Sequence, residues 1–547
     1  MHNPCHAIAT GGMLLSTPSM TSHLNNLPSR KWSIVGLSSA AMALVVVSYL
    51  LAIAVGLACL ALPILLFGYL PINSHYNFVL YRLLFSAFGI VAGGTILWSL
   101  VPTSDKHEVK GVRIDLTKEK RLAQEIEAIA EALHERMPSD VYLIGDANAF
   151  VREEDEAKGF GRRRILALGL PLLQMLTIAQ FRAVLAHEFA HYYAGDTWLG
   201  PWVYDARNSM SRLYMNLGKN SEAMRFLRRV RILAAAYLLL MAGLTMYWKI
   251  FMRITQAISR RQEMRCDELA CYIAGSQPLI EGLEGIRRCA AGLSAYWNSF
   301  VLPIATGGFQ PDLANGFQQF MEAPQVVKAT SEYISQQASV TEPKPFDSHP
   351  PLNMRIEQAR RLDMPAPQSS GFSDSSNLPM ISLIEEVAVL EASLLKKVVP
   401  AMASADLKPL NWETAGADIY IPGWRKRVAD YLPYLSEKKM GDLPFLVLDP
   451  RPVAMEVYNA TAGRLNQAQR IACAYDVLFC AFALCLLENG WKLITKPGNL
   501  TLENGTSTVD PASLMKELRT GKLTVVEWSS LRAKLGIGEW ALAARVA

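Results

Sequence analysis

The sequence predicts a mainly α-helical protein that is anchored in a membrane, with a small β-sheet and a separate α+β region at its C-terminal end. Of the 547 residues, 51% are apolar, and the mean hydropathy of +0.15 is high for a soluble chain. The stretch from Trp32 to Tyr81 contains no Asp, Glu, Lys or Arg. Only two short stretches, 140–145 and 164–170, have the composition of strands, so helices dominate the prediction.

Charge and cysteine content exclude two classes of site. The formal net charge is only +5, and no basic block is interleaved with aromatic residues, so no nucleic-acid partner is expected. None of the eight cysteines forms a C-x-x-C pair, which argues against a zinc site built from thiolates. Most lie in apolar helical stretches, as buried free thiols in a reducing compartment do.

The N-terminal third of the chain begins with a polar tail at 1–31, which we expect to be disordered, and continues into a hairpin of two membrane spans. The hairpin occupies 32–104, with spans at about 34–70 and 78–101, because each apolar run exceeds the ~20 residues that cross a bilayer. Pro63, Gly68 and Pro71 are expected to kink or end the first span. The apolar region is too long, and starts too late, for a cleaved signal peptide.

Basic residues flank the hairpin and set its expected orientation. Arg30 and Lys31 precede it, and the turn between the spans carries no Lys or Arg. The basic residues that come after it are Lys106, Lys110, Arg113, Lys118, Lys120 and Arg121. The positive-inside rule therefore places both ends in the cytoplasm.

A catalytic-type motif, His187-Glu188-Phe-Ala-His191, lies in an alanine-rich apolar run that should be helical. Positions i and i+4 share one helix face, so both imidazoles can point at one metal ion, while Glu188 can reach a metal-bound water. A capping-box pattern, Thr177-x-x-Gln180, opens this helix. The competing interpretation is a pair of surface histidines on an amphipathic helix.

A zinc site needs a third protein ligand. Ala194 and Thr197 stand where the metzincin motif requires Gly and His, so that class is excluded and the ligand must be a carboxylate or His349. The best candidate is Glu263. It shares a helix face with Asp267, so that one acid can ligate while the other accepts a hydrogen bond from a ligand imidazole. The alternative is a solvated helix whose acids pair with neighbouring arginines.

The order of the motifs resembles the HtpX and CAAX-prenyl-endopeptidase family of membrane zinc metallopeptidases. The resemblance spans about 78–362 and rests on the membrane hairpin, HEFAH, S-R-x-x-E-x-x-x-D-x-x-A from Ser259, and S-H-P-P-x-x-x-R-I from Ser348. It implies a zincin-like (gluzincin-type) metallopeptidase domain at 105–362 that binds one Zn²⁺ per chain. Cys266 stands where the family commonly has Ala.

The resemblance also implies a role for each site residue. The implied ligands are His187, His191 and Glu263; the general base is Glu188; the support of the ligands is Asp267; the pair that binds substrate or transition state is His349 and Arg355; and the residue near the cleft is Asn148, in an N-A-F segment. Zinc would acidify a water, and Glu188 would take its proton and pass it to the leaving amine. We further expect the predicted strand around Ile165–Leu168 to bind substrate by edge pairing.

A second apolar segment, 232–248, constrains the topology. Its 17 residues span roughly 25 Å as a helix, short of a ~30 Å hydrocarbon core. A single crossing would also place Glu263 on the opposite side from His187. Two full spans with an embedded, non-crossing helix are therefore expected, with three spans as the alternative. A separate helix is predicted at 254–275, carrying Glu263.

The remaining segments carry no catalytic pattern and no repeat. A helix is predicted at 352–362, a Ser- and Pro-rich linker at 363–379, and a domain of unknown function at 380–547. The apolar helix at 467–487 contains Asp476, so we expect it to be buried in protein rather than to span a membrane.

The leading hypothesis is thus a membrane-anchored zinc endopeptidase of a bacterial inner membrane, with its catalytic domain facing the cytoplasm. Its partners would be the lipid bilayer and membrane or membrane-proximal polypeptides, in membrane protein quality control. One alternative is a non-catalytic membrane scaffold or chaperone that retains the zincin fold, against which the intact Glu188 argues. The other is a CAAX-type processing protease, against which the small number of spans argues.

Overall fold

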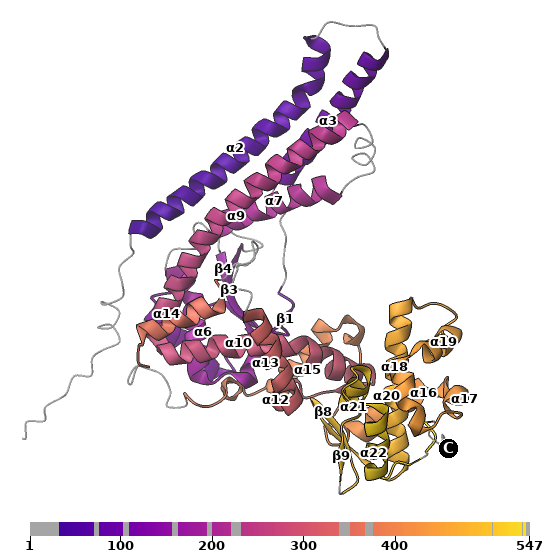
Figure 1. Cartoon of the computed structure of the whole chain (residues 1–547). Coiled ribbons are helices and arrows are strands. Elements are labelled where there is room, and N and C mark those ends of the chain that lie inside the picture. Colours follow the sequence, from indigo (N-terminus) through magenta and orange to yellow (C-terminus); the bar gives the residue numbers. More distant parts are fainter. Residues whose placement is uncertain are drawn as a thin grey trace, which may run out of the picture.

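The structure, a computed structural model, is mainly helical with three small sheets (Figure 1). It describes residues 32–69, 76–101, 109–155, 162–193, 200–219, 231–338, 350–366, 376–410, 412–505, 507–538 and 540–542. The expected disordered tail at 1–31 lies outside the described residues.

The predicted hairpin is present as two long helices that pack side by side, α2 (Trp32–Gly68) and α3 (Tyr76–Leu100). Within them, Met42–Gly68 and Phe78–Leu100 are long and apolar enough to cross a membrane. Helix α2 continues through Pro63 and ends at Gly68, whereas Pro71 lies outside the described residues. Large apolar side chains along both helices are exposed, as lipid-facing residues would be.

A third long helix corrects the prediction for 232–275. Instead of a short embedded helix followed by a separate one, the chain forms one continuous helix, α9 (Arg231–Ala274), of 44 residues. Its stretch Tyr237–Ala274 is also long and apolar enough to be a candidate span. The N-terminal part of α9 packs beside α2 and α3, and its C-terminal part reaches into the domain below them (Figure 1).

Helix α7 (Gly200–Lys219) explains how α9 returns to the domain. Ala206 packs with Phe251 of α9, and Leu213, farther along α7, packs in the same cluster as Tyr237. The two helices therefore run in opposite directions along the hairpin. Because the chain leaves the domain through α7 and comes back through α9, the end of α9 returns to the end of the bundle from which α7 started (Figure 1).

The domain below the bundle contains a four-stranded sheet with the order β1-β2-β4-β3. The strands are β1 (Gly111–Ile114), β2 (Asp140–Ile144), β3 (Ala149–Asp155) and β4 (Arg162–Gly169). Strands β2 and β4 were predicted, whereas β1 and β3 were not. Strand β4 pairs with β2 on one side and with β3 on the other, so the expected edge pairing of Ile165–Leu168 with substrate is wrong. The edge strands of the sheet are β1 and β3.

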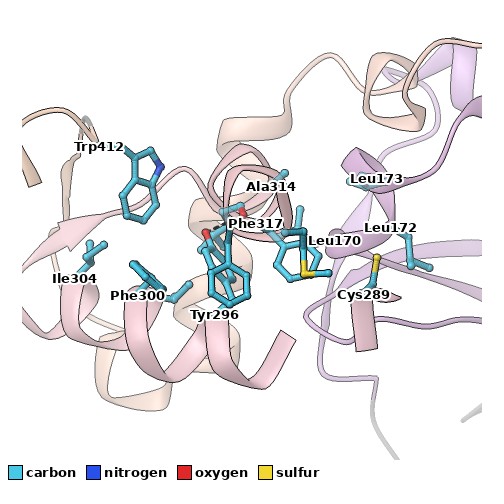
Figure 2. Close-up of a cluster of buried hydrophobic side chains, with 14 of the residues drawn as sticks. Leu170, Leu172, Leu173, Cys289, Tyr296, Phe300, Ile304, Ala314, Phe317 and Trp412 are labelled. Atoms are coloured by element: carbon cyan, nitrogen blue, oxygen red, sulfur yellow. Dashed lines mark hydrogen bonds between the residues drawn. The ribbon is translucent and has the colours of Figure 1, made fainter. Parts of the chain in front are cut away.

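Helices pack on this sheet and on one another around one continuous core. They are α4 (Lys120–Ala132), α5 (Leu170–Met175), α6 (Ile178–Tyr193), α10 (Ser276–Tyr296), α11 (Leu302–Thr306), α12 (Leu313–Glu322), α13 (Pro324–Ala338) and α14 (Leu352–Leu362). The predicted helix at 352–362 is thus confirmed. Figure 2 shows part of the core, where Tyr296 and Phe300 of the α10–α11 segment meet Phe317 of α12.

The C-terminal region packs against the domain and shares its hydrophobic core. Its helices are α15 (Val387–Val398), α16 (Ile421–Ala429), α17 (Leu432–Leu435), α18 (Leu443–Leu448), α19 (Arg451–Ala460), α20 (Gln467–Glu488), α21 (Pro511–Arg519) and α22 (Val525–Leu535). Its strands are β6 (Lys408–Pro409), β7 (Lys492–Lys496), β8 (Asn499–Glu503) and β9 (Thr508–Val509), and β6 pairs with β5 (Phe309–Gln310) of the domain.

Two helices of this region show how it is held together. Helix α15 packs on β1 and β2, and its Glu391 accepts hydrogen bonds from the backbone N–H groups of Leu313 and Ala314, at the start of α12. Helix α20 is long and apolar enough to be a fourth candidate span. It is nevertheless buried among α16, α19 and α21, with side chains such as Phe482 fully enclosed, in agreement with the prediction of a core helix.

Candidate metal centre

Helix α6, which carries the HEFAH motif, is fixed at its start. The predicted capping box is present: the Gln180 N–H donates to Thr177 Oγ1 (3.3 Å), and the Thr177 N–H donates to Gln180 Oε1 (3.1 Å). One turn on, the buried Arg182 binds Glu125 of α4 through two hydrogen bonds of 2.6 and 2.8 Å. This paired charge ties α6 to α4, so the helix enters the site in a defined orientation.

The structure brings His187, His191 and Glu263 together, as the sequence predicted. The two imidazoles come from α6 and the carboxylate from α9, and the ligand atoms that the three residues offer all lie within 4.8 Å of one another. His187 Nε2 is 3.4 Å from Glu263 Oε2, and His191 Nε2 is 3.7 Å from Glu263 Oε1. In the part of the chain that the structure describes, this is the one such group of His, Cys, Asp and Glu side chains.

The donor set suits zinc. A tetrahedral ion with bonds of ~2.0 Å separates its ligand atoms by roughly 3.3 Å, close to the distance between His187 Nε2 and Glu263 Oε2. Two neutral imidazoles and one carboxylate form the set found in catalytic zinc sites that keep a fourth position open. His187 and Glu263 are buried, whereas His191 is 27% exposed, which leaves access to the site from one side.

Asp267 contacts the His187 imidazole through the ring nitrogen that does not face Glu263. Its Oδ1 lies 2.9 Å from His187 Nδ1, so His187 presents Nε2 to Glu263 and His191. The fully buried Asp267 carboxylate is in turn held by Arg355 of α14, whose Nε and Nη2 donate hydrogen bonds of 2.8 and 2.7 Å. Three elements, α6, α9 and α14, therefore meet at one carboxylate.

The acids around His187 also set its protonation. Burial alone disfavours the imidazolium, but hydrogen bonding to Asp267 and then to Glu263 outweighs it and raises the His187 pKa to about 9. The pocket therefore attracts positive charge, which either a proton or a metal cation can supply.

The second imidazole has a different neighbour. His191 Nδ1 lies 3.4 Å from Cys266 Sγ, and the Cys266 side chain is buried. The sequence offered no sign of this contact, because two positions on different helices leave no spacing pattern.

The structure describes three of the other predicted site residues, Glu188, Asn148 and Arg355. Glu188 is partly exposed on α6, next to His187. Asn148 is exposed immediately before β3, where its backbone packs against Gly169. Arg355 is buried against Asp267, and its Nη1 lies 3.7 Å from Glu263 Oε2. The sequence did not predict that Arg355 would hold Asp267 in place. His349 lies outside the described residues.

Comparison with known proteins agrees with this geometry. A sequence model of peptidase family M48 matches residues 116–363, less than half of the chain. Protease HtpX of Pseudomonas putida strain F1 is 25% identical over 256 residues, which cover 44% of this chain and 72% of that protein. Protease HtpX of Pseudomonas entomophila strain L48 is 26% identical over 181 residues, which cover 31% and 56%. No solved structure gave a significant match.

The apolar helices, the His-His-Glu group and the similarity to family M48 together support a membrane metallopeptidase. Residues 116–363, the matched part of the chain, are similar to peptidase family M48 and to the HtpX proteases. The C-terminal region beyond residue 363 lies outside the family match.

Proposed function

We propose that this chain is a membrane-anchored zinc endopeptidase. The observation that carries the proposal is the convergence of His187, His191 and Glu263. Glu188 lies on α6, the helix that carries the two histidines. When bound by these three residues, zinc supplies a Lewis acid for a peptide carbonyl and acidifies a water.

In the proposed reaction, the protein residues position the ligands and move the proton. Glu188 takes a proton on its carboxylate from the attacking water and then delivers it to the leaving amine. Asp267 keeps His187 in the tautomer that presents Nε2, and Arg355 keeps Asp267 in place. His349 remains a proposed partner of the developing oxyanion, together with the positive charge of Arg355.

We propose that the edge strand β3, rather than β4, holds the substrate. Strand β3 packs against α6 and pairs on one side with β4, and no other described strand pairs with it. Its outer edge is proposed to accept an extended peptide, with Asn148 at its start to bind the peptide backbone. Peptides N-methylated at single positions test this, because edge pairing predicts that affinity falls at alternate positions only.

We propose the cytoplasmic side of a bacterial inner membrane as the location of the site, and membrane or membrane-proximal polypeptides as its substrates. The basic flanks of the hairpin favour that side, and α9 connects the membrane bundle directly to the site through Glu263. A role in membrane protein quality control is part of this proposal.

A Glu188→Gln variant tests the proposal against a non-catalytic scaffold. We expect about one zinc per chain to remain, because the ligands are untouched, while casein hydrolysis falls by about a thousandfold or more through loss of the base. Casein hydrolysis that survives the change would refute the mechanism. Hydrolysis of a prenylated C-terminal peptide but not of casein would instead favour the CAAX-type alternative.

A further inference from the structure

A groove separate from the metal centre lies at the junction of the peptidase domain and the C-terminal region, between α12 and β7. It has a volume of about 630 Å³, within the range of ordinary ligand sites. None of the proposed metal ligands or catalytic residues lines it.

The β7 wall of the groove is a strand edge. The groove is lined by Leu493, Ile494, Thr495 and Lys496, which are consecutive. Because successive side chains of a strand point to opposite faces, a surface that touches consecutive residues is the edge, where backbone groups are presented. The sheet order β7-β8-β9 agrees, since β7 pairs only with β8 among the described strands.

The opposite wall is one face of a helix. Asp312, the N-cap of α12, and Asn315 and Gln319 of that helix line the groove at a spacing of three and then four residues, so they form one row. Asn315 is exposed and Gln319 partly so, and an amide can both donate to and accept from a peptide backbone.

Trp412 supplies a further polar group. It lines the groove, and its buried indole Nε1–H has no acceptor in the described parts of the chain. Its backbone carbonyl accepts a hydrogen bond from Thr495 Oγ1 (2.7 Å), which fixes the Trp412 segment beside β7. In Figure 2, Trp412 lies at the opposite end of the core cluster from Leu172 and Cys289.

We propose that this groove binds an extended segment of polypeptide, which adds to β7 as a further strand while α12 contacts its other side. A strand edge facing a polar helix row is suited to main-chain recognition, and Trp412 can donate to a peptide carbonyl. The charges argue against a phosphate ligand, because Lys496 is the single cation of the lining and stands against Asp312 and Glu413. Resting on the proposed function, the occupant is a distal part of the protein substrate.

Filling the groove tests this proposal in the full-length protein. In a Glu188→Gln background, we expect Asn315→Trp to weaken the binding of fluorescein-labelled β-casein by about tenfold, measured by fluorescence anisotropy. Glu322→Trp is the matched control, because Glu322 is exposed on the same helix but does not line the groove. Equal casein affinity in the two variants would overturn the proposal.

Turnover with Glu188 intact separates this groove from the active site. We expect Asn315→Trp to raise the KM for casein while leaving kcat/KM for a peptide of about six residues unchanged, because none of the groove residues belongs to the metal site. An equal loss with both substrates would overturn the proposal. If the chain proved not to be a peptidase, no hydrolysis would occur, yet the anisotropy result would still decide whether the groove binds polypeptide.

A photo-crosslinking residue avoids dependence on the folding of the tryptophan variants. Benzoylphenylalanine in place of the exposed Lys496 is expected to capture casein, and the same residue in place of Glu322 is not. Capture of a second copy of this chain without capture of casein would contradict the proposed occupant, and so would capture of nothing.

Discussion

Replacing Asp267 with alanine should weaken both the fold and the metal site. Asp267 is fully buried, accepts two hydrogen bonds from Arg355 and lies 2.9 Å from His187 Nδ1. Its loss leaves the buried Arg355 cation without the Asp267 carboxylate, and breaking such a buried pair costs about 3–5 kcal/mol of unfolding free energy. It also frees the ring of His187, and losing the partner that orients a ligand histidine lowers metal affinity about 10–100-fold, or about 1.4–2.7 kcal/mol.

Two measurements check these magnitudes. Urea unfolding of the zinc-free protein reports the free energy of unfolding, and competition with a chelator reports the zinc dissociation constant. Glu268→Ala is the control, because Glu268 is on the same helix and pairs with Arg265 at a partly exposed site, where about 1 kcal/mol or less is expected. Adding Arg355→Met to Asp267→Ala should recover part of the lost stability, since no unpaired charge then remains.

Zinc affinity provides the sharper refutation. If Asp267→Ala binds zinc within about twofold of the unaltered protein, Asp267 does not position His187 and the reasoning from their contact is wrong. A double variant no more stable than Asp267→Ala alone would refute the claim that the unpaired charge of Arg355 causes the instability.

Three further predictions concern the surrounding fold. Burial raises the pKa of Glu391 to about 7, so above the ordinary glutamate pKa the folded state binds more protons than the unfolded state. The free energy of unfolding should therefore fall by up to about 3 kcal/mol as the pH rises from about 4.5 through 7. Glu391→Gln should flatten this pH dependence, as measured by urea unfolding at several pH values. Glu125→Ala should cost about 3–5 kcal/mol because it leaves Arg182 buried without its carboxylate, and a loss below 1 kcal/mol in urea unfolding would contradict this. Thr177→Ala removes one half of the capping box and should cost about 1 kcal/mol of unfolding free energy in urea unfolding. The same change should cost no more than this when Gln180 is already alanine.

The features that could be predicted from the sequence are those with a local signal. The hairpin follows from two long apolar runs, of which the second contains a single charged residue, Arg82. The start of α6 follows from the capping pattern at Thr177. The pairing of His187 with His191 follows from the helical repeat, and the choice of Glu263 followed from its spacing to Asp267. Each of these signals lies within one continuous stretch of the chain.

The features that were missed depend on long-range contacts or on misleading local patterns. Strand β3 ends in charged residues, Arg152 to Asp155, so it lacks the apolar alternation that indicates a strand. The continuity of α9 was hidden because Lys249 and Arg253 interrupt its apolar run, although no proline interrupts the helix. The contact of Arg355 with Asp267 joins two helices far apart in the chain, and no spacing rule predicts it.

Zinc X-ray absorption spectroscopy on the purified full-length protein tests the central claim most directly. The proposed site predicts nitrogen and oxygen ligands at about 2.0–2.1 Å, with the multiple-scattering signal of two imidazoles, and loss of one oxygen ligand or of the metal in Glu263→Ala. The near contact of Cys266 with His191 makes sulfur the informative alternative. A zinc–sulfur distance of about 2.3 Å, or a spectrum unchanged by Glu263→Ala, would contradict a site built from His187, His191 and Glu263.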